Sequence, residues 1–245
     1  MPNKPTKSTT VRRRDWRENA REIAIVVAGV FIALIAQQAV EAWDWHEKVQ
    51  AAEAAMREEL LSDDGPQMVQ RLAMHGCISL LLDQLRAAVE RGAPRDEVAA
   101  LIDRYWVDDR TYDRIALDAA QAANVASHLG QQRFTLFANA YSRMGVLEEV
   151  NHREALDWAT LRAFRRNGGP VSDAEKDRLL GAIEALRHDD MVMWLGSTRK
   201  MPTIRKLGQL DQGRVDGFLA DAQDHYGACV LDYATALRQT HQSRM

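Results

Sequence analysis

The sequence predicts an all-α protein, with an N-terminal transmembrane helix that continues into a stalk and then a bundle of about six helices. Three observations lead to this prediction. Residues 23–40 form an apolar run long enough to cross a bilayer, and the segments after residue 66 repeat their apolar residues at the spacing of a helix. No segment sustains the two-residue alternation that is typical of a half-buried strand.

The composition fits one sizeable helical domain with an appendage. The 245 residues include 32 basic and 35 acidic side chains, and the net charge of −3 argues against a nucleic-acid partner. Residues 1–21 are mostly basic and residues 41–60 mostly acidic. The apolar run therefore separates a basic flank from an acidic one.

The chain begins with a segment that lacks helical periodicity. Residues 1–14 contain prolines and polar or basic side chains, which predicts a disordered basic cytoplasmic tail. Residues 15–63 predict one helix that holds the span and the stalk, because no Gly or Pro follows Gly29 until Gly65.

The membrane span is assigned to residues 23–40, whose length as a helix, roughly 27 Å, nearly matches a hydrocarbon core of about 30 Å. Trp16 before the span, and Trp43 and Trp45 after it, are interpreted as interface anchors, because indole rings prefer the headgroup region. A cleavable signal peptide and a buried helix of a soluble protein are the alternatives. The signal peptide is disfavoured because the residues after Ala36 offer no well-spaced cleavage site.

The basic flank predicts the orientation, because Lys and Arg are retained on the cytoplasmic side. We expect a single-pass protein of the bacterial inner (plasma) membrane with a cytoplasmic N-terminus. Residues 67–245 would then form a periplasmic helical bundle domain, and the lipid bilayer would be a partner of the chain.

One narrow face of the span carries small residues and an amide: Gly29, Ala33, Ala36 and Gln37. Small residues allow close approach of two helices in lipid, and glutamine can hydrogen-bond across the contact. We interpret these residues as a transmembrane packing face for a homo-oligomer or a membrane protein partner. The alternative is a lone span, in which glycine and alanine are also common.

The span also matches a pattern, E-I-x-x-V-x-x-G-x-x-x-A-L, followed by a polar exit with Trp and Glu. The matching positions are Glu22, Ile23, Val26 or Val27, Gly29, Ala33, Leu34, Glu41 and Trp43. In this pattern the chain resembles a family of small bacterial inner-membrane proteins with a single N-terminal span. A weaker likeness extends to residues 113–130. The resemblance implies the membrane topology and implies no activity.

Within residues 67–245, glycines and prolines divide the helical pattern. We expect breaks at Gly65-Pro66, Gly92, Gly130 and Gly168-Gly169-Pro170. The apolar stripes between these breaks cover residues 74–88, 98–105, 115–129, 134–166, 172–202 and 215–237. Pro94 is expected at the first position of its helix, Ser172 and Glu175 form a capping box, and Pro202 is expected to kink or divide the helix that follows.

No catalytic, cofactor or metal site is predicted. Glu149 and His152 have the spacing of a di-iron half-site, but the second half-site is missing and a solvated pair is favoured. Ser197 and Lys200 match an S-x-x-K spacing without its companion motifs, so that this match is interpreted as chance.

Cys77 and Cys229 are the two cysteines of the chain. In an oxidising periplasm they could form a disulfide worth about 4 kcal/mol, and the alternative is two small buried thiols. The aromatic side chains could line a ligand pocket, although core packing is favoured. These side chains are Tyr105, Trp106, Tyr141, Trp158 and Trp194.

These features favour a membrane-anchored, non-enzymatic periplasmic protein that acts through protein–protein interaction or scaffolding. The alternatives are a sensor or small-ligand-binding module that works with a separate partner, and an enzyme with a dispersed site. The sequence leaves open the identity of the partner or ligand, the oligomeric state, the cysteine linkage and the spatial order of the helices.

Overall fold

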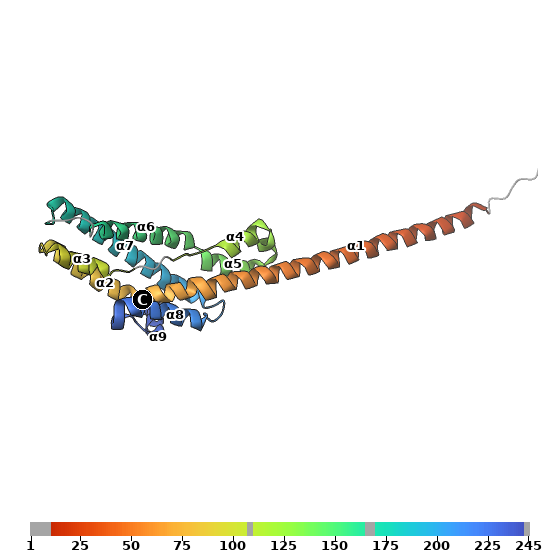
Figure 1. The fold of residues 1–245 in the computed structure, drawn as a ribbon. Helices are drawn as coiled ribbons and strands as arrows, with labels where there is room; N and C mark the ends of the chain where they lie inside the picture. Colours follow the sequence, from red (N-terminus) through yellow and green to blue (C-terminus); the bar gives the residue numbers. More distant parts are fainter. Residues whose placement is uncertain (1–10, 107–109, 165–169, 243–245) are drawn as a thin grey trace, which may run out of the picture. The chain divides into compact units, whose positions relative to one another are not determined.

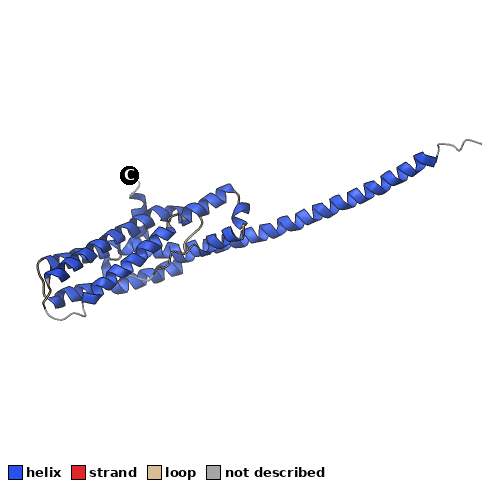
Figure 2. Cartoon of the chain, turned by 90° about the horizontal axis from the view of Figure 1, so that it is seen from above, coloured by secondary structure: helices blue, strands red, loops and turns tan. Residues whose placement is uncertain are grey.

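The computed structural model describes residues 11–106, 110–164 and 170–242, and every regular element in these ranges is a helix (Figures 1 and 2). The predicted all-α class is therefore confirmed. The chain divides into two compact units, Met1–Gln50 and Ala51–Met245.

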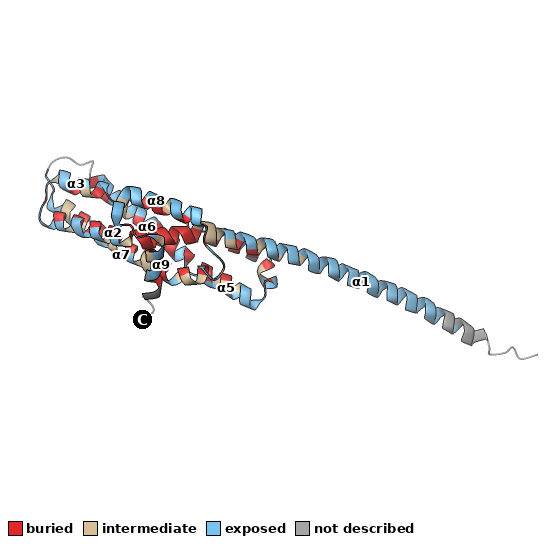
Figure 3. Cartoon of the chain, turned by 90° about the horizontal axis from the view of Figure 1, so that it is seen from below, coloured by how far each residue is buried: buried red, intermediate tan, exposed pale blue. Residues whose placement is uncertain are grey.

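The first unit holds most of helix α1 (Val11–Glu58). This helix begins at Val11, ahead of the start expected at residue 15, and residues 1–10 of the predicted tail lie outside the described residues. The large apolar side chains of residues 23–40 are 47–68% exposed, and Figure 3 shows the helix exposed along most of its length. Among the described residues, one helix is long and apolar enough to cross a membrane, and it includes this run.

The expected break at Gly65-Pro66 does not occur. A π-helical segment, Glu59–Asp64, follows α1 and leads directly into α2 (Gly65–Glu90). Pro66 lies in the first turn of α2, where its missing N–H is tolerated. Gly65 is required for close packing instead, because a Cβ atom there would lie 2.5 Å from Leu210 Cδ2.

The core of the second unit is built on α2, α6 (Met144–Phe164) and α7 (Asp173–Ile204). α7 packs against both α2 and α6. All three helices carry buried residues, and Figure 3 shows that buried residues gather within the bundle. The remaining helices cover this core. They are α3 (Arg95–Asp103), α4 (Ile115–Ala122), α5 (Gln131–Tyr141), α8 (Gln212–Tyr226) and α9 (Tyr233–Gln242), with 3-10 turns at Val125–His128 and Gly227–Cys229.

Three predicted helices are divided in the structure. The stripe at 134–166 breaks between α5 and α6, where Arg143 has a φ of +73°, and the stripe at 115–129 breaks at Asn124, with a φ of +57°. The stripe at 215–237 breaks at Gly227, which has a φ of +69°. Arginine rarely adopts a positive φ, so the break at Arg143 carries no signal that the sequence shows. Asparagine adopts this conformation more readily and often follows the end of a helix, so Asn124 is a readable signal that the prediction left unused.

Other predicted boundaries agree with the structure. The capping box of Ser172 and Glu175 opens α7, and Gly92, with a φ of +69°, follows the end of α2. Two prolines differ from the prediction. Pro94 is the N-cap of α3 rather than its first helical residue. Pro202, which was expected to kink or divide its helix, lies inside the last turn of α7, which continues to Ile204. Gly168 and Gly169 lie outside the described residues.

Candidate functional site

A buried ion-pair cluster joins the three central helices. Arg71 of α2 donates to both carboxylate oxygens of Glu154 of α6, at 3.0 and 2.7 Å. The same guanidinium donates to Asp190 Oδ1 of α7 at 2.9 Å. All three side chains are buried. Burial disfavours the charged guanidinium, but the two carboxylates outweigh that penalty and raise the pKa of Arg71 above its usual value.

Neighbouring side chains complete this cluster. The hydroxyl of Tyr105 donates to Glu154 at 2.9 Å, and His75 Nδ1 lies 2.6 Å from Asp190 Oδ2. The ring of His75 stacks on that of Trp194, with centroids 5.0 Å apart. Because the carboxylates are already engaged by protein donors, this cluster is suited to holding three helices together rather than to binding a substrate.

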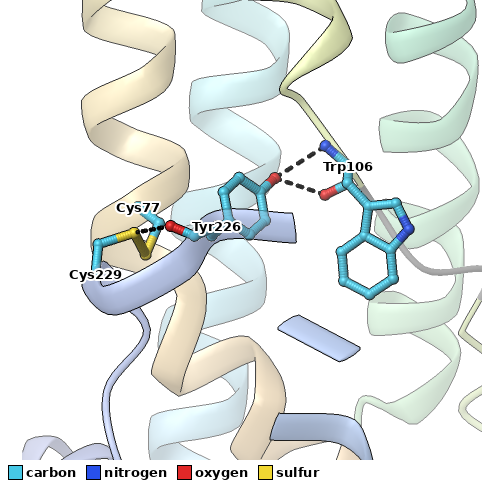
Figure 4. Close-up of a disulfide and its surroundings, with 4 residues drawn as sticks. All are labelled: Cys77, Trp106, Tyr226 and Cys229. Atoms are coloured by element: carbon cyan, nitrogen blue, oxygen red, sulfur yellow. Dashed lines mark hydrogen bonds between the residues drawn. A yellow bond between two sulfur atoms is a disulfide. The ribbon is translucent and has the colours of Figure 1, made fainter. Parts of the chain in front are cut away.

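A disulfide links Cys77 of α2 to Cys229, with their Cα atoms 5.7 Å apart (Figure 4). The turn that carries Cys229 follows Tyr226, whose hydroxyl accepts from the backbone N–H of Trp106 at 3.0 Å and donates to the Trp106 carbonyl at 2.6 Å. The C-terminal part of the domain is thereby fastened both to α2 and to the segment after α3.

The aromatic residues considered as a pocket line none of the three hollows described for this domain. Tyr105 is buried at the ion-pair cluster, and Tyr141 is buried with its hydroxyl 3.3 Å from the Met56 carbonyl oxygen. Trp106 stacks on His225 with centroids 4.1 Å apart, whereas Trp158 lies 6.5 Å from Tyr105.

A hollow of about 370 Å³ lies along α6 and α7. It is termed the cationic groove, and its lining residues are Arg143, Val146, Leu147, Val192, Leu195, Gly196, Arg199 and Lys200. The residues from α7 recur at the three- and four-residue spacing that places side chains on one helical face.

The shape of the cationic groove depends on two backbone features. Gly196 lets α7 approach α6, because a Cβ atom there would lie 2.5 Å from Leu147 Cδ2. Arg143 sits at the break between α5 and α6, and its carbonyl accepts from the N–H groups of Val146 and Leu147 at 2.9 and 3.1 Å. Arg143, with its positive φ, thus immediately precedes α6, and its side chain lines the cationic groove.

Lys200 is held at the same end of the cationic groove. Its Nζ donates to the Asn139 carbonyl at 2.8 Å and to Ser142 Oγ. Burial, and then the positive charge of Arg143, lower the pKa of Lys200. Among the described residues, no lining carboxylate and no direct ion pair neutralises Arg143 or Arg199.

A further buried acid lies at the end of the π-helix. Asp64 is 1% exposed, and neither of its carboxyl oxygens has a hydrogen-bond partner within the described part of the chain. Burial, and then the negative charges of Glu59 and Asp113, raise the pKa of Asp64 to about 8. This raised pKa favours the neutral acid over the carboxylate at pH 7.

The predicted transmembrane residues lie on α1. Gly29, Ala33, Ala36 and Gln37 are exposed, and a Cβ atom at Gly29 would meet nothing within 4 Å. Among the predicted anchors, Trp16 and Trp43 are 72% and 67% exposed, and Lys48 Nζ lies 4.9 Å from the ring centroid of Trp45. The roles in packing and anchoring stay predictions.

The weaker chemical motifs do not form sites. Glu149 and His152 are exposed, and Glu149 pairs with Arg153 at 3.4 Å. The described residues contain no group of three or more His, Cys, Asp or Glu that could hold a metal ion. Ser197 is buried without a hydrogen-bond partner among the described residues, while Lys200 is directed to Asn139 and Ser142.

Sequence inspection missed the cationic groove and the ion-pair cluster. The positions 192, 195, 196, 199 and 200 fall on one helical face and change from apolar to basic, which is a readable signal. Arg143 could not be placed beside them, because it lies about fifty residues away along the chain.

Comparisons of the chain with known protein families, with curated proteins and with solved structures find no match. The resemblance of the span to a membrane-protein family therefore stays a prediction, and the function must be argued from the residues themselves.

Proposed function

We propose that this chain is a single-span protein of the bacterial inner membrane that presents its helical domain to the periplasm and acts there through contacts with other proteins, without catalysing a reaction. The observation that carries the proposal is the exposure of the apolar side chains of residues 23–40. A core helix of a soluble protein would bury such a face.

The energetics support a bilayer as the missing environment. Ten large apolar side chains of this run are exposed: Ile23, Ile25, Val26, Val27, Val30, Phe31, Ile32, Leu34, Ile35 and Val40. At about −0.3 to −0.6 kcal/mol each, they favour membrane insertion by roughly 3 to 6 kcal/mol.

Two features support the periplasmic location of the second unit. The basic residues precede the span and the acidic residues follow it, which favours a cytoplasmic N-terminus. The disulfide of Cys77 and Cys229 suits an oxidising compartment, because thiols in the cytosol are kept reduced. Both features agree on the same orientation.

The location is tested with alkaline phosphatase, which is active only in the periplasm, fused after Met245. We expect an active fusion that stays in the membrane fraction after carbonate washing, and an intact mass that retains residues 1–22. An inactive fusion would overturn the orientation. An active, soluble fusion with a shortened N-terminus would show that residues 23–40 belong to a signal peptide.

Action through protein contacts is tested by crosslinking in native membranes followed by capture of the tagged chain. The matched control is the same chain with Gly29→Leu and Ala33→Leu, which alters the predicted packing face and leaves the domain intact. We expect one reproducible crosslinked species that the control weakens. Recovery of the chain alone, with no crosslink to itself or to another protein, would contradict this part of the proposal.

A second candidate function is favoured by the cationic groove. Three cations that no lining carboxylate accompanies, beside the partly exposed Val192 and Leu195 and the exposed Val146, are what a small-ligand-binding module would need. Neither the ion-pair cluster nor the disulfide requires them. In this function the domain would bind a small molecule and work with a separate partner protein.

A further inference from the structure

The cationic groove has two chemically different ends. Val192 and Leu195 lie toward one end on α7, and Arg199 and Lys200 lie toward the other. Leu147 of α6 meets α7 at Gly196, and Arg143 precedes it beside Lys200. The apolar side chains and the cations therefore follow one another along a single hollow.

The dimensions suit a narrow ligand. From Val192 to Lys200 the helix rises by about 12 Å, which is comparable to an alkyl chain of medium length. The volume of about 370 Å³ is within the range of small-molecule pockets. Val146 is 49% exposed at the side of this hollow, so that a bound alkyl chain would cover apolar surface that water now contacts.

The charge of the cationic groove distinguishes it from two other hollows of the domain. A hollow at Thr160 and Phe164 is lined by Glu175 as well as Arg178, and a hollow near Pro94 is lined by Asp173 as well as Lys176. In both cases an acid of the protein accompanies the cation. Among these three hollows, the cationic groove alone has no carboxylate lining it.

We infer that the cationic groove binds an anionic amphiphile, with a carboxylate or phosphate head at Arg143, Arg199 and Lys200 and an alkyl chain along Leu195, Val192 and Val146. The inference rests on the second candidate function and names its ligand class. Arginine presents donors in a planar fork that matches the oxygens of either head. Lys200 adds a donor that is already fixed by Asn139 and Ser142.

The test uses the full chain in phosphatidylcholine nanodiscs without detergent, because detergent would compete for the groove. Calorimetric titrations with octanoate, octyl phosphate, octanol and inorganic phosphate are corrected with empty nanodiscs. We expect octanoate, octyl phosphate or both to bind at least about tenfold more tightly than octanol and inorganic phosphate, since both head and chain contribute. Binding of octanoate but not octyl phosphate would identify the ligand as a fatty carboxylate. Binding of octyl phosphate but not octanoate would identify a ligand with a phospholipid-like head.

Variants locate the binding. The double variant Arg143→Glu and Arg199→Glu is expected to weaken the binding of the preferred anion by at least about tenfold. Lys206→Glu is the matched control, because Lys206 is an exposed cation just beyond α7 that does not line the groove, and it should leave the affinity unchanged. Circular dichroism and the mobility of the oxidised chain show whether each variant is folded, and Arg199→Gln replaces the double variant if that one is not.

Four results would overturn the inference: no binding, equal binding of octanol, equal binding of inorganic phosphate, or equal weakening by Lys206→Glu. Preferential binding of an acidic, apolar peptide over both alkyl anions would assign the groove to a protein partner instead. These outcomes are independent of the phosphatase fusion. If the fusion is active but no anion binds, only the proposed ligand class is contradicted. If an anion binds but the fusion is inactive, only the proposed periplasmic location is contradicted.

Discussion

Residues 23–40 of α1 and the centre of the second unit differ in which kind of side chain is exposed and which kind is buried. In α1 the large apolar side chains are exposed, whereas in the second unit Arg71, Glu154 and Asp190 are buried. Each arrangement is unfavourable unless something compensates for it. In the second unit the compensation lies within the chain, as hydrogen-bonded ion pairs, while for α1 it must come from outside, which is the argument for a bilayer.

The largest expected effect is on the membrane insertion of residues 23–40. Phe31→Arg together with Ile32→Arg places two charges near the centre of the span, which should disfavour insertion by about 5 to 7 kcal/mol. The measurement is the share of the chain left in the membrane after carbonate washing, which should fall sharply. Gln37→Leu with Gln38→Leu is the control and should retain the chain. Undiminished retention of the arginine variant would refute the span.

The buried ion-pair cluster is tested by the variant Arg71→Met, which leaves the carboxylates of Glu154 and Asp190 buried without their cation. We expect the free energy of unfolding of the second unit to fall by about 3 to 5 kcal/mol. Urea unfolding followed by tryptophan fluorescence measures it. Arg187→Met removes an exposed pair with Asp83 and should cost less than about 1 kcal/mol. Equal losses in the two variants would mean that burial of the ion pair is unimportant.

Removal of the disulfide is expected to have the next largest effect on stability. The double variant Cys77→Ser and Cys229→Ser should lower the free energy of unfolding by about 2 to 4 kcal/mol, because the bond closes a long loop in the unfolded chain. Unfolding of the oxidised protein, the reduced protein and the variant is compared. A reduced protein as stable as the oxidised one, or free thiols in protein purified without reductant, would contradict the expected linkage.

The raised pKa of Asp64 predicts that the free energy of unfolding depends on pH. Its pKa is about 8 in the folded chain and near 3.8 when unfolded, so unfolding between these values releases a proton. Stability should therefore fall by about 1.4 kcal/mol for each pH unit, or about 2 kcal/mol from pH 6 to pH 7.5, and level off above pH 8. Asp64→Asn should lack this component. An identical slope in both proteins would show that Asp64 is already ionised when folded.

The smallest effect concerns the predicted packing face. Gly29→Leu with Ala33→Leu should weaken self-association in the membrane by on the order of 1 kcal/mol, because leucine separates the two helices. Crosslinking yield measures the dimer. Val27→Leu with Phe31→Leu alters the opposite face and should leave the yield unchanged. If both double variants reduce the yield equally, the face at Gly29 has no special role.

The sequence predicts much of the fold and little of the candidate site. The apolar run of residues 23–40 and the cap at Ser172 are local features. The structure has the run within α1 and the cap at the start of α7, as expected. The sequence prediction lacks the breaks at Asn124 and Arg143. Asparagine readily adopts a positive φ and could have indicated the first break, whereas arginine gives no such signal for the second. Tertiary packing can hold such strained residues, although local propensity opposes them.

The sequence by itself determined properties that depend on neighbouring residues: the helical class, the apolar run of residues 23–40, and the basic and acidic flanks of that run. Hydropathy and helical period follow from residues within a few turns. The tertiary structure alone decided that Arg71 meets Glu154 and Asp190, and that Arg143 joins Lys200 at the cationic groove. These residues lie on different helices, and only packing of the whole domain selects which helical faces meet.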